Sequence, residues 1–144
     1  MDKQAASSGQ WIAGRIPVLE CLRARKRAAR KLYLLENGKG LEPIRAEAGL
    51  VPIEACSRSE LDRLLPNFTH QGAILEAEPL PVHALENWAA RPFPADCIVM
   101  ALNEIEDPHN FGAIVRSAAA AGARGVVFGK HRAAPISSAS LKSA

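Results

Sequence analysis

Cysteine and histidine are scarce in this chain, and neither occurs in a pattern that a metal site or a disulfide framework requires. The three cysteines, Cys21, Cys56 and Cys97, are widely spaced, odd in number and free of any C-x-x-C pair. This spacing argues against a structural zinc site and favours reduced thiols in a cytoplasmic protein. Because the four histidines are scattered as well, we expect no metal centre.

Long hydrophobic runs and a leading apolar segment are also lacking. The longest apolar run, Cys97–Leu102, falls far short of the roughly 20 residues that a membrane-spanning helix needs. Met1–Gln10 is polar, and we expect residues 1–10 to be disordered. The hydrophobic and charged fractions of 48% and 23% are typical of a folded soluble protein, which argues against global disorder and against a membrane protein.

Positive charge is concentrated near one end of the chain. Arg15–Lys31 holds seven basic residues and one acid, whereas residues 32–100 carry five basic and ten acidic side chains. Clustering of this kind is typical of a patch that contacts phosphate groups, and a solvated helix face gives the same pattern. Charge alone therefore leaves nucleic-acid binding and a plain surface as alternatives.

Two blocks of alternating helices and strands are predicted, which indicates an α/β protein. The first block is expected to begin with a helix from Pro17 to about Ala29. A later helix has the capping pair Ser57 and Glu60. The remaining elements of this block are expected to be strands at Lys31–Glu36, Val51–Cys56 and Gly72–Ala77, a short helix through Arg45, and the capped helix at Arg58–Leu65.

A connector with four prolines, residues 79–95, separates the blocks and is expected to be a linker. A short helix at Val82–Ala90 interrupts it, with Leu85 and Trp88 as its packing residues. Strand–helix–strand order with short links predicts parallel strands in the second block. Its elements are expected to be a strand at Cys97–Leu102, a helix at Phe111–Ala121, a strand at Gly125–Gly129 and a helix that starts at Ser137 or Ser138.

The densest local signal is the stretch EDPHNFGAIVR, residues 106–116, which is followed by a run of alanines. Asp107-Pro108 favours a turn after a strand, and Asn110 is expected to cap the next helix. Gly112 in the first helical turn allows another backbone or a ligand to come close. Arg116 is either a functional side chain or a surface arginine whose stem packs along the helix.

This stretch resembles the first signature motif of the SpoU, or TrmH-type, RNA ribose methyltransferases of the SPOUT class. The motif D-P-x-N-x-G-x-I-x-R is matched at Asp107, Pro108, Asn110, Gly112, Ile114 and Arg116. Gly14–Leu22 resembles the opening of the family's RNA-binding N-terminal domain, and the tripeptide at residues 70–72 resembles the motif that closes it. The resemblance implies a small α/β/α RNA-binding domain at residues 11–78 and the first part of a parallel-sheet methyltransferase domain at residues 96–144.

The resemblance implies transfer of a methyl group from S-adenosylmethionine to a ribose 2′-hydroxyl, most often of a guanosine in large-subunit ribosomal RNA. In the family, the arginine that matches Arg116 is catalytic, and the asparagine that matches Asn110 supports it. Because a guanidinium stays protonated at neutral pH, we expect Arg116 to clamp a phosphate and stabilise the developing alkoxide; the alternative, a role as base, would require strong desolvation of this side chain. The implied partner is RNA, ribosomal rather than transfer RNA, and the whole domain is expected to form a homodimer.

The family's second and third motifs lie beyond the point where this sequence stops. In the family these segments form the C-terminal knot, most of the cofactor pocket and the dimer contact. The sequence therefore resembles an amino-terminal portion of a methyltransferase or a natural truncation of one, and no cofactor-binding residue is assigned. Because the second block has too few elements to cover its sheet, we expect partial exposure of Ile98, Met100, Val126 and Val127.

The RNA contacts are expected in the N-terminal domain, along a basic first helix and in the closing motif. The candidates are Arg15, Arg23, Arg25, Lys26, Arg27, Arg30, His70 and Gln71. Two other functions remain open at this point. One is a non-catalytic RNA-binding module that uses this domain alone, and the other is a small protein-interaction domain.

Overall fold

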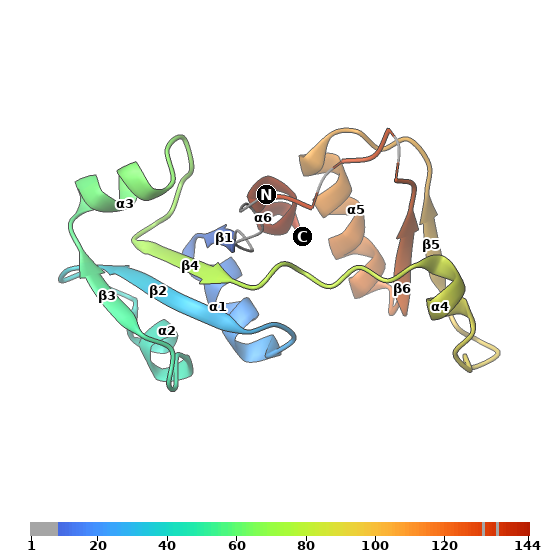
Figure 1. Cartoon of the computed structure of the whole chain (residues 1–144), viewed down its shortest axis with the longest axis horizontal. Coiled ribbons are helices and arrows are strands. Elements are labelled where there is room, and N and C mark those ends of the chain that lie inside the picture. Colours follow the sequence, from blue (N-terminus) through green and yellow to red (C-terminus); the bar gives the residue numbers. More distant parts are fainter. Residues whose placement is uncertain (1–8, 131, 135) are drawn as a thin grey trace, which may run out of the picture. The chain divides into compact units, whose positions relative to one another are not determined.

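The structure, a computed structural model, describes residues 9–130, 132–134 and 136–144. The chain divides into two compact units, Met1–Leu80 (unit 1) and Pro81–Ala144 (unit 2). Helices and strands alternate along both units, as the sequence predicts (Figure 1). The α/β class is thereby confirmed.

Unit 1 is built on a four-stranded sheet with the strand order β1-β4-β2-β3. Strands β2 and β3 are parallel, whereas β4 runs antiparallel to both β1 and β2. The register places Leu32 beside Leu75, so aliphatic side chains of neighbouring strands share one face. The strands are β1 (Gln10–Ala13), β2 (Ala29–Leu35), β3 (Ile53–Cys56) and β4 (Ala73–Ala77).

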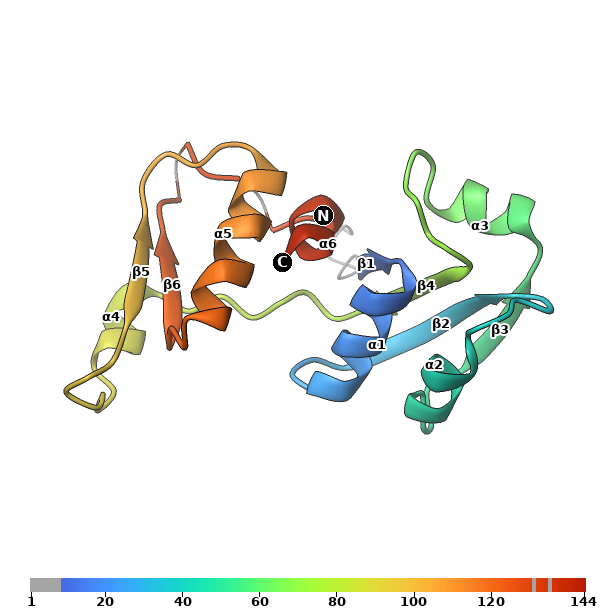
Figure 2. The same cartoon turned by 180° about the vertical axis from the view of Figure 1, so that it is seen from behind.

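Helices α1 (Arg15–Ala24) and α2 (Glu42–Glu47) cover one face of this sheet, and α3 (Arg58–Leu64) covers the other (Figures 1 and 2). Successive strand residues point to opposite faces, so both layers bury side chains of the same strand. On the α3 side, Leu61 packs with Tyr33, Cys56 and Ile74. The result is the α/β/α layering expected for the first block.

Helix α3 begins with the capping box that the sequence predicts. Ser57 Oγ accepts a hydrogen bond from the Glu60 N–H, and the Glu60 carboxylate accepts one from the Ser57 N–H at 2.7 Å. The Ser57 hydroxyl also donates to the Glu60 carboxylate at 2.7 Å, and this bond, together with the one from the Ser57 N–H, stabilises the ionised form and lowers the pKa of Glu60. The capping box is confirmed, and α3 ends one residue before the predicted limit.

Two predictions for unit 1 are wrong. The sequence predicts that Gln10 belongs to a disordered tail, but Gln10 begins β1, which pairs with β4; residues 1–8 lie outside the described residues. The predicted helix from Pro17 to Ala29 ends at Ala24, because Arg25 adopts a left-handed conformation at φ 48°. Strand β2 already starts at Ala29, so the chain must leave the helix and turn within the four residues between them.

Unit 2 contains a two-stranded parallel sheet of β5 (Val99–Leu102) and β6 (Gly125–Phe128), which confirms the predicted strand direction. Helix α5 (Pro108–Ala120) lies against this sheet (Figure 2), and Phe111 meets Phe128 edge to face with ring centroids 5.1 Å apart. The last helix, α6 (Ser138–Ser143), packs against α5 and is capped by Ser137, one of the two predicted starts.

The proline-rich connector contains helix α4 (Leu85–Ala89), which belongs to unit 2. Its Trp88 packs on Phe93 and lies against Gly125, where a Cβ atom would come within 2.6 Å of the indole ring. Leu85 is half exposed, so its prediction as the other packing residue is wrong. The segment predicted as a linker therefore provides a packing helix for β6.

The strands of unit 2 keep much of their apolar surface exposed, as predicted. Ile98 is 52% exposed and Val99 is 41% exposed. Met100, Val126 and Val127 are only half-buried. Helix α5 and the contact of Trp88 with Gly125 leave these apolar side chains only partly covered, whereas a parallel sheet is normally covered on both faces.

Candidate functional site

The first turn of α5 carries the signature motif, and its cap differs from the prediction. The Asp107 carboxylate accepts hydrogen bonds from the N–H groups of His109 at 3.1 Å and Asn110 at 3.3 Å. Pro108 occupies the first helical position. A backbone N–H there would have no acceptor within the helix, so its absence in proline costs no hydrogen bond. Asn110 is therefore the third helical residue and not the cap.

Gly112 provides the close approach between α5 and α6 that its position in the motif suggested. A Cβ atom at this residue would overlap the Ser140 carbonyl oxygen, and it would stand 2.6 Å from Ser143 Cβ. A second tie between the helices joins His109 Nδ1 and Ser143 Oγ at 3.0 Å. The space over Gly112 is thus filled by the backbone of this same chain.

Arg116 and Asn110, the two candidate catalytic residues, are both exposed on α5. They are six residues apart, so the helical repeat places them about 120° from each other around the axis. Arg116 falls on the same stripe as His109, seven residues earlier. Asn110 lies on a different side, so the helix by itself does not bring the two candidate groups together.

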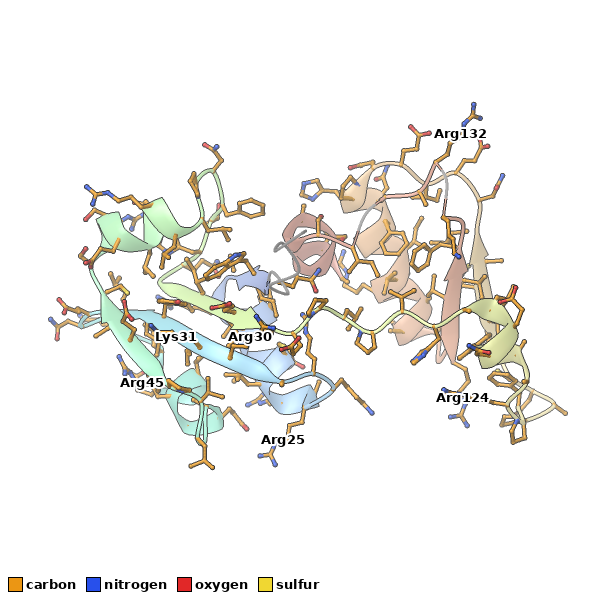
Figure 3. All side chains as sticks on the ribbon, viewed as in Figure 1. Arg25, Arg30, Lys31, Arg45, Arg124 and Arg132 are labelled. Carbon is orange, nitrogen blue, oxygen red and sulfur yellow. The ribbon has the colours of Figure 1, made fainter. Side chains whose placement is uncertain are left out.

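In unit 1, Arg25 and Lys26 are the candidate RNA contacts that reach furthest into solvent. Both are exposed, and within the described residues neither forms an ion pair; Figure 3 shows Arg25 directed away from the ribbon. Together with Arg27 they line a hollow of about 610 Å³ between the end of α1 and the segment after α2. An open concave surface with cationic walls can accept a phosphate backbone.

The other three cations of this region are held by neighbouring groups, and they do not lie on one basic helix as predicted. Arg23 pairs with Glu20 and Glu47, at 3.5 and 3.3 Å. Arg27 donates to the Gln10 side chain and to the Glu78 carbonyl. Arg30, in strand β2, pairs with Glu78 at 2.6 Å and with Glu76 at 3.8 Å.

Arg15, His70 and Gln71 come together where β1 passes into α1. Gln71 accepts two hydrogen bonds from Arg15, one from its N–H and one from its Nε–H, each 3.1 Å long. His70 is only 4% exposed, and its Nε2 lies 3.0 Å from Asp62 Oδ1. Sequence reasoning missed Asp62, because an acid on the exposed side of a short helix has no distinguishing local pattern.

Tyr33 and Lys31 show how the cations and aromatic rings of β2 are used. Lys31 pairs with Glu54 at 2.6 Å, and this hydrogen bond is the main cause that raises the pKa of Lys31. The same ammonium lies 5.1 Å from the centre of the Tyr33 ring. Tyr33 is buried, and burial raises the pKa of its hydroxyl. The Lys31–Glu54 ion pair therefore joins the neighbouring strands β2 and β3.

Neither a metal site nor a membrane span is found among the residues that the structure describes. Among them, no group of three or more histidine, cysteine and acidic side chains is placed to hold a metal ion. None of the helices in the same residues combines the length and the apolar character that a membrane span requires.

Comparison with known families decides the relationship of this chain. Residues 11–83, just over half of it, match the family described as RNA 2′-O ribose methyltransferase substrate binding. Residues 97–144 match the SpoU rRNA methylase family. The chain belongs to the SpoU family of RNA methyltransferases. Both parts of SpoU enzymes are thus represented, in the order that the sequence motifs predicted.

Curated SpoU relatives are similar along most of this chain. An uncharacterized tRNA/rRNA methyltransferase of Mycobacterium ulcerans (strain Agy99) is 37% identical over 133 residues, which cover 88% of this chain and 43% of the relative. One from Mycobacterium tuberculosis (strain ATCC 25177 / H37Ra) is 36% identical over 138 residues, covering 91% and 42%. The chain therefore spans less than half the length of these relatives.

Solved SpoU structures share the fold. The crystal structure of an RNA 2′-O ribose methyltransferase is 26% identical, with a TM-score of 0.70 over 94% of this chain and 50% of that one. The SpoU methyltransferase AviRb from Streptomyces viridochromogenes, in complex with the cofactor AdoMet, is 21% identical. Its TM-score is 0.71 over 98% of this chain and 52% of that one.

The described part of the SpoU domain does not by itself form a binding site for S-adenosylmethionine. The space over Gly112 is taken by Ser140 and Ser143 of α6. The N–H groups at the start of α5, which could otherwise face a ligand, are bonded to Asp107. We therefore assign no residue of this chain to cofactor binding.

Proposed function

We propose that the protein methylates ribose 2′-hydroxyls of RNA, with a guanosine of large-subunit ribosomal RNA as its target and S-adenosylmethionine as methyl donor. The observation that carries the proposal is the exposure of Arg116, the arginine that ends the matched motif. A guanidinium on the surface of α5 is open to a nucleotide, whereas one buried beneath the sheet would have ruled the role out. Membership of the SpoU family supports the same reaction.

Arg116 acts on the nucleophile in this proposal. A ribose hydroxyl is a poor nucleophile until its proton leaves or the developing negative charge on its oxygen is stabilised. The guanidinium stays protonated, so it donates hydrogen bonds to that oxygen and to an adjacent phosphate. Asn110 supports the arrangement from another side of α5 as a neutral hydrogen-bonding group.

Unit 1 holds the RNA in this proposal. Arg15, Arg25 and Lys26 make the main phosphate contacts, because each keeps donors that have no partner among the described residues. Gln71, the hydrogen-bonded Arg27 and the ion-paired Arg23 and Arg30 contribute less, since each already has partners within the chain. Three free thiols support a reducing, cytoplasmic setting, in which the enzyme acts as a homodimer on ribosomal rather than transfer RNA.

The second candidate function is RNA binding without catalysis. It is favoured by the organisation of unit 1, which contains its own four-stranded sheet, its own buried core and every candidate RNA contact. Under this alternative, the chain binds RNA with strong salt dependence, and Arg116 has no measurable role.

The experiment uses the protein extended beyond Ala144 by the domain segment that its SpoU relatives carry. Methyl transfer from labelled S-adenosylmethionine to a transcript of large-subunit ribosomal RNA is measured, and resistance to alkaline cleavage identifies 2′-O-methylated positions. Nucleoside analysis of the digested product then shows whether guanosine is the modified base. We expect Arg116→Ala to lower the rate by roughly 100-fold or more while RNA binding stays largely intact, because most phosphate contacts lie in unit 1.

Arg124→Ala is the matched control, because Arg124 is an exposed arginine of the same unit outside the motif. It should keep the full rate. Undiminished methylation by Arg116→Ala would overturn the catalytic assignment. RNA binding by the extended protein with no methyl transfer would support the second candidate.

A further inference from the structure

The buried imidazole of His70 fixes the turn that closes unit 1. Its Nδ1 accepts a hydrogen bond from the Gly72 N–H at 3.0 Å, and its Nε2 faces Asp62 Oδ1, also at 3.0 Å. A ring that accepts at Nδ1 carries its proton on Nε2, so the Asp62 carboxylate is the acceptor of the second bond. The His70 carbonyl also accepts from the Ala73 N–H at 2.9 Å.

The turn holds Gln71 in a conformation that it would not adopt freely. Gln71 has a φ of 51°, in the left-handed region that is unfavourable for residues with a Cβ atom. Bonds on both sides of it, from Gly72 to the His70 ring and from Ala73 to the His70 carbonyl, keep this conformation in place. Both the side chain and the carbonyl of Gln71 are thereby presented to Arg15.

Gln71 in turn fixes the direction of the Arg15 guanidinium. Its carbonyl accepts from Arg15 Nε–H and its side-chain oxygen accepts from the Arg15 N–H, so the arginine is held at both ends. The guanidinium passes over Gly40, where a Cβ atom would stand 2.9 Å from Nη1. Within the described residues, neither Nη nitrogen of Arg15 has a hydrogen-bond partner, so both are available to a ligand.

We propose that His70 is a positioning residue for RNA binding: by locking the turn at Gln71 it aims the two free Nη groups of Arg15 at a phosphate of the RNA. This inference rests on the proposed function, in which Arg15 contacts RNA. At 4% exposure, with both ring nitrogens engaged, His70 does not contact the RNA itself. Its contribution reaches the RNA only through Arg15.

The test is a double-mutant cycle on the 144-residue chain, with affinity for a transcript of large-subunit ribosomal RNA as the readout. Arg15→Gln is expected to weaken binding about tenfold or more, as loss of one charged hydrogen-bonding contact does. The slope of log affinity against log salt should fall by about 0.9. His70→Leu, which fills the same space without hydrogen bonds, should weaken binding by the same factor.

The decisive measurement is the effect of His70→Leu when Arg15 is already Gln. A residue that acts through Arg15 has no further effect there, whereas it keeps its full effect when Arg25 is replaced by Gln. Equal losses from His70→Leu with and without Arg15 would overturn the proposal, because they would indicate direct contact or general loss of structure. Unchanged binding by His70→Leu alone would overturn it as well.

Two variants guard against simple unfolding. His70→Asn places an amide oxygen where Nδ1 accepts from Gly72, so it should recover most of the lost affinity. Gln71→Asn tolerates the left-handed conformation and keeps the backbone carbonyl that accepts from Arg15 Nε–H, so it should retain most of the affinity in a folded chain, unlike His70→Leu. Failure of either expectation would overturn the positioning role of His70.

A readout without RNA separates this inference from the proposed function. The Arg15 Nε–H resonance should exchange slowly with solvent in the parent chain and rapidly in His70→Leu. If Arg15→Gln leaves RNA affinity unchanged, the RNA role of Arg15 fails and the positioning role fails with it, whatever the exchange rate. If Arg15→Gln weakens binding while the resonance is indifferent to His70→Leu, only the positioning role fails.

Discussion

The Ser140 carbonyl of α6 lies directly against Gly112 of α5, so close that no side chain fits between the two helices. The motif glycine therefore has a packing role within unit 2. Ser143 completes the contact with its hydrogen bond to His109. Helix packing of this kind depends on the absence of a single Cβ atom.

Replacing Gly112 by Ala should destabilise unit 2 by about 1–3 kcal/mol, because α6 must move to admit the methyl group. The sign is diagnostic, since alanine for glycine inside a helix ordinarily stabilises by up to about 1 kcal/mol. Urea unfolding can be followed through Trp88, the unit 2 tryptophan, in a Trp11→Phe background. Ser117→Ala, on an exposed part of α5, is the control and should stay within about 0.5 kcal/mol of the parent. A more stable Gly112→Ala chain would contradict the packing role.

Removing the helix cap with Asp107→Ala should destabilise α5 by about 1 kcal/mol. The N–H groups of His109 and Asn110 would lose their acceptor. Hydrogen exchange of the amides in the first turn of α5 gives the measurement. The neighbouring Glu106→Ala should leave these rates unchanged, and equal effects of the two substitutions would argue against a cap at Asp107.

Arg25 and Arg30 make a matched pair that separates binding from folding. Arg25 is exposed, so Arg25→Gln should weaken RNA binding and lower the salt slope by about 0.9 while stability stays the same. Arg30 pairs with Glu76 and Glu78, so Arg30→Gln should lower the stability of unit 1 and change RNA affinity less. Filter binding and urea unfolding distinguish them. The reverse pattern would place the RNA contact on β2 instead.

The Ser57–Glu60 capping box predicts a pH dependence. The folded-state pKa of Glu60 lies below its ordinary value of 4.5, because Ser57 hydrogen bonds stabilise the carboxylate. The contribution of Glu60 to stability is therefore complete above pH 4.5 and is lost as the pH falls through the lower, folded-state pKa. Unfolding followed by Trp11 fluorescence between pH 3 and 6 measures it. Glu60→Gln should reduce the slope in this range, and an unchanged slope would contradict the assignment.

Local chemistry was sufficient to predict much of the fold. The box at Ser57 and Glu60 and the cap at Ser137 are visible in the sequence because each is completed within three residues. Asn110 was misplaced for the same local reason. Asp107 and Asn110 are both good caps, and the choice depends on Pro108 occupying the first helical position.

Features that depend on distant residues were not predictable from local pattern. Strand β1 is four residues long and is defined by its pairing with β4, more than sixty positions later in the chain. The partners Arg15 and Gln71 are 56 positions apart. Helix α1 also ends earlier than predicted, because the chain from Ala29 onward pairs with β4. This sheet pairing outweighs the helical preference of the basic segment.

Among the described residues, the outer edges of the two-stranded sheet of β5 and β6 pair with no further strand. Each strand has a partner on one side among the described residues, and VMAL and GVVF contain neither a charged residue nor a proline to discourage a further strand from adding. Purified on its own, this chain should self-associate with rising concentration and become turbid. A lysine introduced at Val99, which already faces solvent, is the simplest change to keep it dispersed.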